Sequence, residues 1–269
     1  MELSSMRHSA AHVMAAAVCR LFENVKLDIG PSTEDGFYYD FDLPKRLTPE
    51  DFPAIEKEMA RIVSDNVPFE RQVVSREQAS ELFGGKSQKF KLERLADIPA
   101  GEDITIYRSG DFTDLCAGPH VPGTGQIGVF KLLSIASAYY RGDERNPQLQ
   151  RVYATAFPSQ KALDDWLAMQ EEARKRDHRK LGRELEIFVF DDDVGPGLPL
   201  WLPKGGIIIE ELERLAKETE FDAGYHRVKT PHICKEKMYL TSGHLPYYKE
   251  SMFPPMELEH EELVLRPMN

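Results

Sequence analysis

The segment Gly36–Asp42 reads Gly-Phe-Tyr-Tyr-Asp-Phe-Asp, an aromatic run in which acidic residues alternate toward its end. Aromatic residues in such a short alternating run are typical of a β-strand. Before it, apolar residues recur at helical spacing from Met6 to Leu21 and stop ahead of the turn Asp28–Pro31. This spacing predicts a first helix within residues 4–24.

Two signals downstream of this strand mark helix starts. Thr48–Asp51 combines a capping hydroxyl, a proline in the first turn and acidic residues at the positive end of a helix. It predicts a helix to about Asn66. Ser75–Gln78 has the form of a capping box and predicts a short helix that ends at Gly84–Gly85.

Segments with strand composition follow these helices. They lie around Ile104–Arg108, Val129–Tyr140 and Gln148–Phe157. Turn residues separate or flank them at Gly110, Pro122–Gly125 and Arg141–Pro147. Helices early in the chain and an antiparallel sheet later predict an α+β first domain over residues 1–158.

The composition changes in the second half of the chain. A long polar helix capped by Ser159 is expected to run through Trp166 to about Leu181, which makes residues 159–183 a helical connector. A further domain is expected over residues 184–269. Its predicted elements are a strand at Leu185–Phe190, a loop at Val194–Pro203, a helix at Lys204–Ala223 ended by Gly224, a strand through Val228 broken at Pro231, and a strand-like end at Glu262–Arg266.

Length and cysteine content limit the class of protein. At 269 residues the chain is long enough for two domains of roughly 150 residues each. No apolar run approaches the roughly 20 residues of a membrane span, and no charged-then-apolar leader precedes the first helix, so we expect a cytoplasmic protein without a membrane partner. Cys19, Cys116 and Cys234 are too few and too scattered for a disulfide framework, and Cys19 is interpreted as a core residue.

Charge argues against a protein that coats nucleic acid. Acidic residues outnumber basic ones by 45 to 34, which gives a net charge of −11, and we expect no DNA partner. One basic block nevertheless runs from Arg174 to Arg183. On charge alone it is either a solvated helix end favoured by the helix dipole or a local contact for a phosphate backbone.

Two clusters of chemically active residues lie about a hundred positions apart. His8 and His12 are four residues apart, so a helix places both imidazoles on one face. Asp114–His120 reads Asp-Leu-Cys-Ala-Gly-Pro-His, a turn that can bring Cys116 and another imidazole to that face. Three imidazoles and a thiol can bind a soft metal or hold and activate a water for hydrolysis. A His pair alone is as readily an ordinary solvated pair, but the added thiol and carboxylate favour a functional cleft.

Several motifs together resemble the editing domain of threonyl-tRNA synthetases. They are His8–His12, Gly36–Phe41, Asp114–Pro122, and Tyr140–Asp143 followed by Leu149–Tyr153. The second half is similar to the start of the class II catalytic domain of that family, an antiparallel-sheet domain that would be incomplete here. The long helix that ends at Phe221–Tyr225, with its continuation to Pro231, resembles motif 1, and Leu265–Asn269 resembles the stretch that leads toward motif 2.

The resemblance implies hydrolytic editing of tRNA(Thr) that has been charged with serine by mistake. Serine and threonine differ by one methyl group, worth only about 1–3 kcal/mol in a binding site, so a second site is used. His8 and His12 are implied to position substrate and water, and Lys91 to polarise the water or stabilise negative charge. Asp114 is implied to hold the seryl amine. No cofactor is needed for this reaction.

Cys116 and His120 are implied to bound the acyl pocket and to share in water activation. A rival interpretation, based on the related editing domains of alanyl-tRNA synthetases, places zinc on His8, His12, Cys116 and His120. Against it, a lysine in the same pocket would repel a dication. Two more interpretations stay open: a free-standing deacylase that acts in trans, and a tRNA-binding fragment without catalytic competence.

For the full-length family the resemblance implies ligation of threonine to tRNA(Thr) with ATP, Mg and Zn, in a homodimer. The residues implied are Arg174, Lys175, Arg176 and Arg179 for phosphates of the tRNA acceptor end, Pro231 for the dimer-forming motif 1, and Met268 for the edge of the threonine pocket. The motif 2 arginine, motif 3, the zinc ligands and the anticodon-binding domain would lie beyond Asn269. We therefore expect no synthetic activity from this chain.

Overall fold

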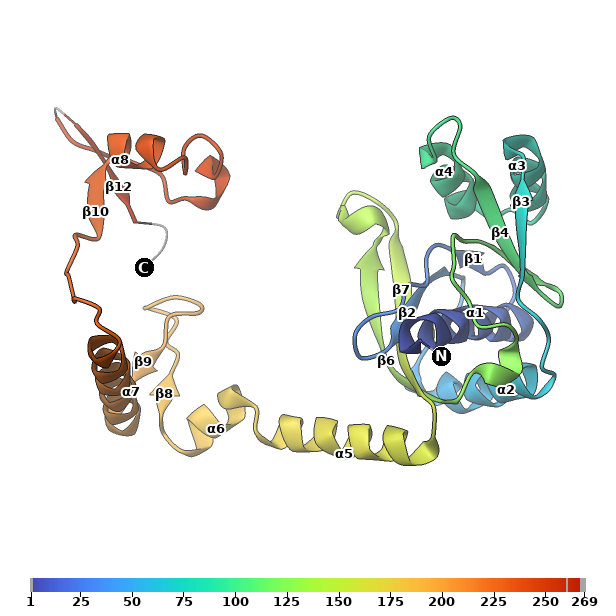
Figure 1. Ribbon diagram of the computed structural model, residues 1–269, viewed down its shortest axis with the longest axis horizontal. Helices are drawn as coiled ribbons and strands as arrows, with labels where there is room; N and C mark the ends of the chain where they lie inside the picture. Colours follow the sequence, from blue (N-terminus) through green and yellow to red (C-terminus); the bar gives the residue numbers. More distant parts are fainter. Residues whose placement is uncertain (1, 260, 267–269) are drawn as a thin grey trace. The chain divides into compact units, whose positions relative to one another are not determined.

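A computed structural model describes residues 2–259 and 261–266 of the chain (Figure 1). The chain divides between Lys175 and Arg176 into two compact units, and each is described by itself. Helices and antiparallel sheets make up both units, which confirms the α+β fold class. In the described ranges, no helix has both the length and the apolar composition that crossing a lipid bilayer requires.

The first unit is built on one long helix and a four-stranded sheet (Figure 1). The helix is α1 (Leu3–Leu21). The sheet has the order β1-β2-β7-β6, with all neighbours antiparallel. Its strands are β1 (Lys26–Leu27), β2 (Phe37–Asp42), β6 (Val129–Tyr139) and β7 (Gln148–Phe157). The predicted first helix and the three predicted strands in this sheet are therefore confirmed.

Helix α1 packs against β2 and β7 and is buried nearly all round. On β2, Phe37, Tyr39 and Phe41 alternate onto the buried face and are at most 1% exposed. Around the circumference of α1 lie small side chains, all at most 5% exposed: Ala10, Ala11, Ala15, Ala16 and Ala17. Small side chains let the helix lie close to the aromatic strand, so this helix position is set by packing.

Helix α2 (Phe52–Ser64) packs on α1, preceded by a 3-10 turn at Pro49–Asp51. Thr48 and Asp51 form the cap of that turn: the Thr48 amide donates to Asp51 Oδ2 at 2.9 Å. Short 3-10 turns also occur at Thr124–Gln126, which contacts α1 and α2, and at Tyr140–Gly142.

A smaller layer of the first unit combines a three-stranded sheet, of order β3-β4-β5, with two short helices. Its elements are β3 (Glu70–Val74), α3 (Arg76–Gly85), α4 (Lys89–Asp97), β4 (Ile104–Ser109) and β5 (Phe112–Leu115). Their buried core contains Ala79, Phe83, Leu95, Ile104 and Ile106. The predicted capping box at the start of α3 is confirmed, because the Ser75 hydroxyl accepts from the Gln78 amide.

Sequence reasoning did not find β3, β5 or α4. Four of the five residues in β3 are exposed, so an apolar alternation is missing there, and β5 has only four residues. Helix α4 reads Lys-Phe-Lys-Leu-Glu-Arg-Leu-Ala-Asp, and no side chain caps its start at Gln88. A short helix without a cap gives little local signal.

The connector predicted as one helix from Ser159 to Leu181 is two helices. Ser159 does cap the first, α5 (Gln160–Lys175), and α6 (His178–Glu184) follows after a break. At the break Asp177 leaves the helical backbone region with ψ of 122°, and its side chain accepts from the Arg179 amide. An aspartate that bonds its own downstream amide starts a new helix instead of continuing the old one.

The second unit contains α6 and a set of short elements. They are β8 (Phe188–Val189), β9 (Leu200–Trp201), α7 (Pro203–Asp222), β10 (Ile233–Lys235), α8 (Glu236–Thr241), a 3-10 turn at Lys249–Ser251, β11 (Met256–Glu257) and β12 (Glu262–Leu265). Strands β8 and β9 form an antiparallel pair, and the other three form an antiparallel sheet of order β10-β12-β11. The helix predicted at Lys204–Ala223 and the strand-like end are confirmed.

Two strand predictions in this unit are wrong or too long. The strand predicted through Val228 is irregular backbone, and Val228 is 77% exposed. A strand needs a neighbour for its backbone groups, and the paired segment β10 begins only after Pro231. The strand predicted at Leu185–Phe190 shrinks to the two residues of β8.

Gly36 precedes β2, and a Cβ at this position would lie 2.2 Å from the Ala154 carbonyl oxygen on β7. Gly36→Ala is therefore expected to lower the free energy of unfolding of the first unit by about 1–3 kcal/mol, because backbone must move. Gly84→Ala in α3 is the control, since nothing lies within 4 Å of a Cβ there. Urea unfolding with the same midpoint for both variants would contradict this account of the β2–β7 contact.

Candidate functional site

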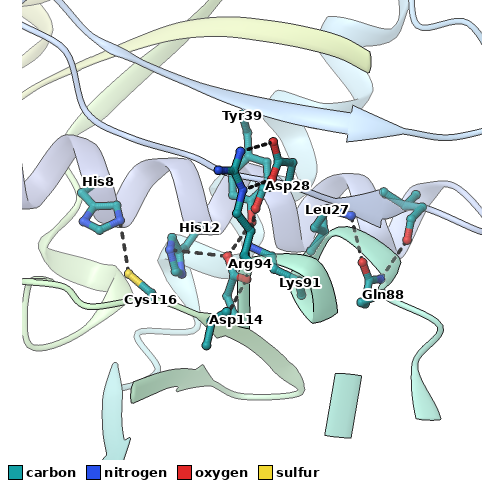
Figure 2. Close-up of polar contacts among 12 residues, drawn as sticks. His8, His12, Leu27, Asp28, Tyr39, Gln88, Lys91, Arg94, Asp114 and Cys116 are labelled. Atoms are coloured by element: carbon teal, nitrogen blue, oxygen red, sulfur yellow. Dashed lines mark hydrogen bonds and ion pairs between the residues drawn. The ribbon is translucent and has the colours of Figure 1, made fainter. Parts of the chain in front are cut away.

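The four predicted donor residues meet in the first unit. His8 and His12 lie on one face of α1, and Cys116 and His120 lie on the loop that follows β5. One ligand atom from each residue lies within 4.8 Å of the others. Cys116 Sγ is 3.4 Å from Nε2 of both His8 and His120, and Figure 2 shows the first of these contacts. The two helix-borne imidazoles and the thiol and imidazole of the turn therefore meet, as the sequence predicts.

The loop is held in place by its own backbone. Cys116 is fixed to β4, because its amide donates to the Thr105 carbonyl at 3.1 Å and the Thr105 hydroxyl donates to its carbonyl at 2.7 Å. Gly118 has φ of +77°, and a Cβ there would lie 2.3 Å from the Tyr107 hydroxyl oxygen. Only glycine fits this turn, and its amide donates to Cys116 Sγ at 3.2 Å.

The His120 ring is held on several sides. It stacks on Phe69 with the ring centroids 4.9 Å apart and the planes 9° apart, and the Tyr107 ring meets it edge-on at 4.4 Å. Its Nδ1 lies 3.0 Å from Ser9 Oγ, while its Nε2 faces Cys116. Ser9 was not predicted, although it lies inside the His8–His12 motif.

A buried charge network borders the imidazole cluster. Lys91 Nζ on α4 lies 2.5 Å from Asp114 Oδ1 on β5, and both residues are at most 3% exposed. The Tyr39 hydroxyl donates to Asp114 Oδ2 at 2.5 Å, and His12 Nε2 lies 3.6 Å from the same oxygen (Figure 2). Lys91 also donates to the Asp28 carbonyl and to the Tyr39 hydroxyl.

Tyr39 was missed as a site residue. Its sequence context predicts a strand, and the alternation of β2 puts it on the buried face with Phe37 and Phe41. Only the hydroxyl distinguishes it from these core phenylalanines. A buried phenol usually has a hydrogen-bond partner, and here the partners are a carboxylate and an ammonium.

Burial keeps the imidazoles neutral. It lowers the pKa of His8 and, to a much greater extent, of fully buried His12, where the nearby His8 and Lys91 act in the same direction. Burial followed by the neighbouring rings of His12 and His8 lowers the pKa of His120 to about 2. A neutral imidazole has one bare nitrogen, which can accept a proton or bind a metal.

The site thiol is protonated near neutral pH. Burial raises the pKa of Cys116 to about 11, with Asp114 acting in the same direction. Burial also raises the pKa of Cys19 to about 12, and its side chain packs against the core of the first unit, which supports its interpretation as a core cysteine. Since the thiolate is the nucleophilic form of cysteine, the protonated Cys116 is poorly suited to attack an ester.

The donor set also suits a soft divalent metal. Three imidazoles and a thiolate match a tetrahedral zinc site, and the His8 ring has the Pro119 carbonyl as an outer partner, as metal-bound imidazoles commonly do. Two features oppose a dication: the Lys91 ammonium acts on His8 and His12, and the thiol would have to lose a proton whose pKa is raised. His8, His12, Cys116 and His120 would be the ligands.

A pocket of about 750 Å³ opens beside the charge network. It is lined by Lys91 and Asp114, by Cys19 near the end of α1, by Gln88 at the start of α4 and by Phe112 of β5. This volume lies within the range of about 300–1,000 Å³ that is usual for small-molecule sites.

The remaining predicted residues lie outside this cluster. Arg174 and Lys175 are the last two residues of α5, Arg176 follows it, and Arg179 lies in α6. All four side chains are exposed. Arg174, Lys175 and Arg179 form ion pairs with acids two or three residues away. Pro231 lies in the irregular segment before β10, and Met268 lies outside the residues that the structure describes.

Comparison with known proteins gives a consistent result. Residues 104–153 match the family described as "Threonyl and Alanyl tRNA synthetase second additional domain". A threonine–tRNA ligase of Geobacillus kaustophilus is 55% identical over 99% of this chain, and threonine–tRNA ligase 1 of Bacillus subtilis is 53% identical over the same share. The chain spans about two fifths of their length, 41% and 42%.

One solved structure is also similar in sequence. It is described as the RNA binding domain of threonyl-tRNA synthetase from Cryptosporidium parvum Iowa II, and it is 39% identical over 35% of this chain and 23% of its own. Its TM-score of 0.33 is too low to support an argument about the fold. The fold class therefore rests on the strand pairing and helices of this chain.

The raised pKa of Cys116 predicts slow alkylation of the native protein. At pH 7.5 we expect iodoacetamide to modify Cys116 about 300-fold more slowly than a free cysteine, whose pKa is about 8.5, and the rate to rise until about pH 11. Peptide mass spectrometry measures the rate at this residue. The same protein in urea is the control, because unfolding removes the burial. Fast modification of native Cys116 at pH 7 would contradict a protonated thiol.

Proposed function

The chain is homologous, over 99% of its length, to a segment of the threonine–tRNA ligases, and from this premise we propose that its first unit is a hydrolytic editing site. The proposed substrate is tRNA(Thr) that carries serine. The observation that carries the proposal is the convergence of His8, His12, Cys116 and His120 beside the Lys91–Asp114 pair. These groups supply what hydrolysis of an aminoacyl ester requires: a proton acceptor, hydrogen-bond donors and a positive charge.

The neutral imidazoles favour direct attack by water. A ring with a lowered pKa keeps a bare nitrogen across the working pH range, and this nitrogen can accept a hydrogen bond from a water and orient it for attack. Such a ring is a weak base, so it activates the water through this hydrogen bond and is not suited to hold the proton. The protonated Cys116 then serves as a wall of the acyl pocket and as a hydrogen-bond donor, and no acyl-enzyme is needed. We assign water positioning to His8 and His12, and water activation to His120 with the thiol.

Lys91 and Asp114 are proposed to act as a pair. The Lys91 ammonium lowers the pKa of both His8 and His12, which shows that its charge reaches the imidazole cluster, so it is suited to stabilise negative charge on the reacting ester. Asp114 was expected to hold the seryl amine. Its oxygens already meet Lys91, Tyr39 and the Leu115 amide, so we propose that it chiefly orients Lys91 and His12.

The adjacent pocket of about 750 Å³ is lined by Lys91 and Asp114 and not by His8, His12, Cys116 or His120. We propose that the tRNA end approaches on this side of the charged pair. For the whole protein, of which this chain spans a part, we propose ligation of threonine to tRNA(Thr) with ATP, Mg and Zn. We also propose a homodimer formed through the region that includes Pro231. Met268 remains a proposed edge of the threonine pocket.

Purified chain is expected to hydrolyse seryl-tRNA(Thr) at least tenfold faster than threonyl-tRNA(Thr), because one added methyl group is worth about 1–3 kcal/mol in a tight pocket. His8→Ala is expected to slow the reaction by about 10²-fold or more, as for loss of a group that positions or deprotonates water. Release of labelled amino acid measures both rates. His226→Ala, an exposed histidine of the second unit, is the control. Equal rates for the two substrates, or no hydrolysis, would count against editing.

Zinc is the second candidate for the same residues, because the donor set fits it. Metal analysis of the purified chain, with deacylation measured before and after chelation, separates the two mechanisms. A metal-free mechanism predicts full activity after chelation and a large loss in Lys91→Met. One zinc per chain together with activity that chelation abolishes would favour the metal-dependent reaction.

The basic residues around the end of α5 are proposed to contact phosphates of the tRNA acceptor end. Exposed ion pairs contribute little, so Arg174 and Arg179 can exchange their acidic partners for phosphate. Arg174→Glu with Arg179→Glu should weaken tRNA binding and make its salt dependence shallower, by about 0.7–0.9 in log–log slope for each lost contact. Lys57→Glu with Arg61→Glu on α2 is the charge-matched control. Equal effects of the two pairs would indicate a nonspecific charge effect.

A further inference from the structure

Ser9 is the one residue of the His8–His12 motif that touches the site without a role in the proposed reaction. It is fully buried, at 0% exposure, on the helix that carries both histidines. We propose that Ser9 is a positioning residue that fixes the tautomer of His120, with the ring proton on Nδ1 and the bare nitrogen, Nε2, facing the site. The catalytic consequence rests on the proposed editing function; the tautomer itself does not.

The Ser9 hydroxyl has three hydrogen-bond neighbours, and their chemistry determines the role of each. A serine hydroxyl has one proton to donate and two lone pairs that accept. The Val121 amide lies 3.0 Å from Ser9 Oγ, and because an amide can only donate, it uses one lone pair. The Ser5 carbonyl lies 2.8 Å away and can only accept, so it takes the hydroxyl proton. What remains for His120 Nδ1, at 3.0 Å, is a lone pair.

His120 Nδ1 must therefore be the donor in its contact with Ser9. In a neutral imidazole only one nitrogen carries a proton, and the hydrogen bond made by one nitrogen determines the state of the other. His120 Nε2 is then an acceptor, 3.4 Å from Cys116 Sγ.

The Cys116 thiol limits how many ring nitrogens of the cluster can be occupied by a hydrogen bond. Cys116 has one proton, and its sulfur lies 3.4 Å from two imidazole nitrogens, one on His8 and one on His120. It can donate to only one of them at a time. The Gly118 amide already donates to the sulfur and occupies one of its lone pairs. With His120 Nε2 bare, this nitrogen is free to accept a hydrogen bond from a water whenever the thiol donates to His8.

A structural role explains only part of what Ser9 does. Serine within a helix often bonds the carbonyl four residues earlier, which accounts for the Ser5 contact. The contacts to Val121 and His120 are with residues more than a hundred positions away, and both lie on the loop that carries the thiol. Ser9 thus joins α1 to this loop at His120 Nδ1, the nitrogen whose hydrogen bond determines the tautomer of the ring.

The direct test is the nitrogen NMR spectrum of the histidines in the full chain, uniformly labelled with ¹⁵N, chelated and without substrate. His120→Gln identifies the signals of His120 by their loss. We expect a protonated Nδ1 and an unprotonated Nε2 at neutral pH. A proton on Nε2 with a bare Nδ1 would overturn the proposal. This measurement does not depend on activity, so it stays decisive if the chain hydrolyses no seryl-tRNA(Thr), a result that would count against the proposed function alone.

The kinetic test compares Ser9→Ala with two other variants. Ser9→Ala should mix the two tautomers and lower kcat for seryl-tRNA(Thr) by about 10- to 100-fold, with KM nearly unchanged, as for other groups that orient a catalytic imidazole. Ser9→Thr keeps the hydroxyl and should restore the tautomer and most of kcat. Ser109→Ala is the control, because among the described residues that buried hydroxyl has no hydrogen-bond partner. A Ser9→Ala protein with wild-type tautomer and kcat would refute the assignment.

Discussion

The buried ion pair between Lys91 and Asp114 is the interaction on which the site depends. It joins α4 to β5, and through Tyr39 and His12 it extends to β2 and α1. Two helices and one strand from each sheet of the first unit therefore meet at the Asp114 carboxylate. Two charges removed from water are tolerated only with close geometry and satisfied hydrogen bonds. Loss of one partner would leave an uncompensated charge in the core, typically at a cost of about 3–5 kcal/mol. The smaller layer and the main sheet are therefore tied together at the candidate site.

The site separates charge from proton transfer. Lys91 and Asp114 form the charged part, whereas the imidazoles and the thiol of Cys116 form a neutral part. The neutral groups have protons that they can donate and lone pairs that accept hydrogen bonds. Their burial keeps the thiol protonated and the imidazoles uncharged. Such a cluster suits the movement of a proton from water at an ester that is already reactive, and it does not suit a thiolate attack.

The sequence allowed prediction of α1, β2, β6 and β7, because apolar periodicity and capping residues act locally. The spacing of His8 and His12 predicted a common face, and family resemblance supplied Lys91. Tyr39 and Ser9 escaped notice because their importance lies in partners distant along the chain, Asp114 and His120. The break at Asp177 and the irregular backbone at Val228 depended on a choice between competing hydrogen bonds that local propensity does not resolve.

The alanines of α1 have no reactive groups, yet they determine where the histidines stand. Ala10, Ala11 and Ala15 to Ala17 lie buried around the helix, so a larger side chain at any of them would have to push the helix away from one of the elements packed on it. Displacement by about 1 Å can lower a reaction rate 10²-fold. A random screen for inactive variants should therefore return substitutions at these chemically silent positions beside those at the reacting groups, and the protein's tolerance to mutation along this helix should be correspondingly narrow.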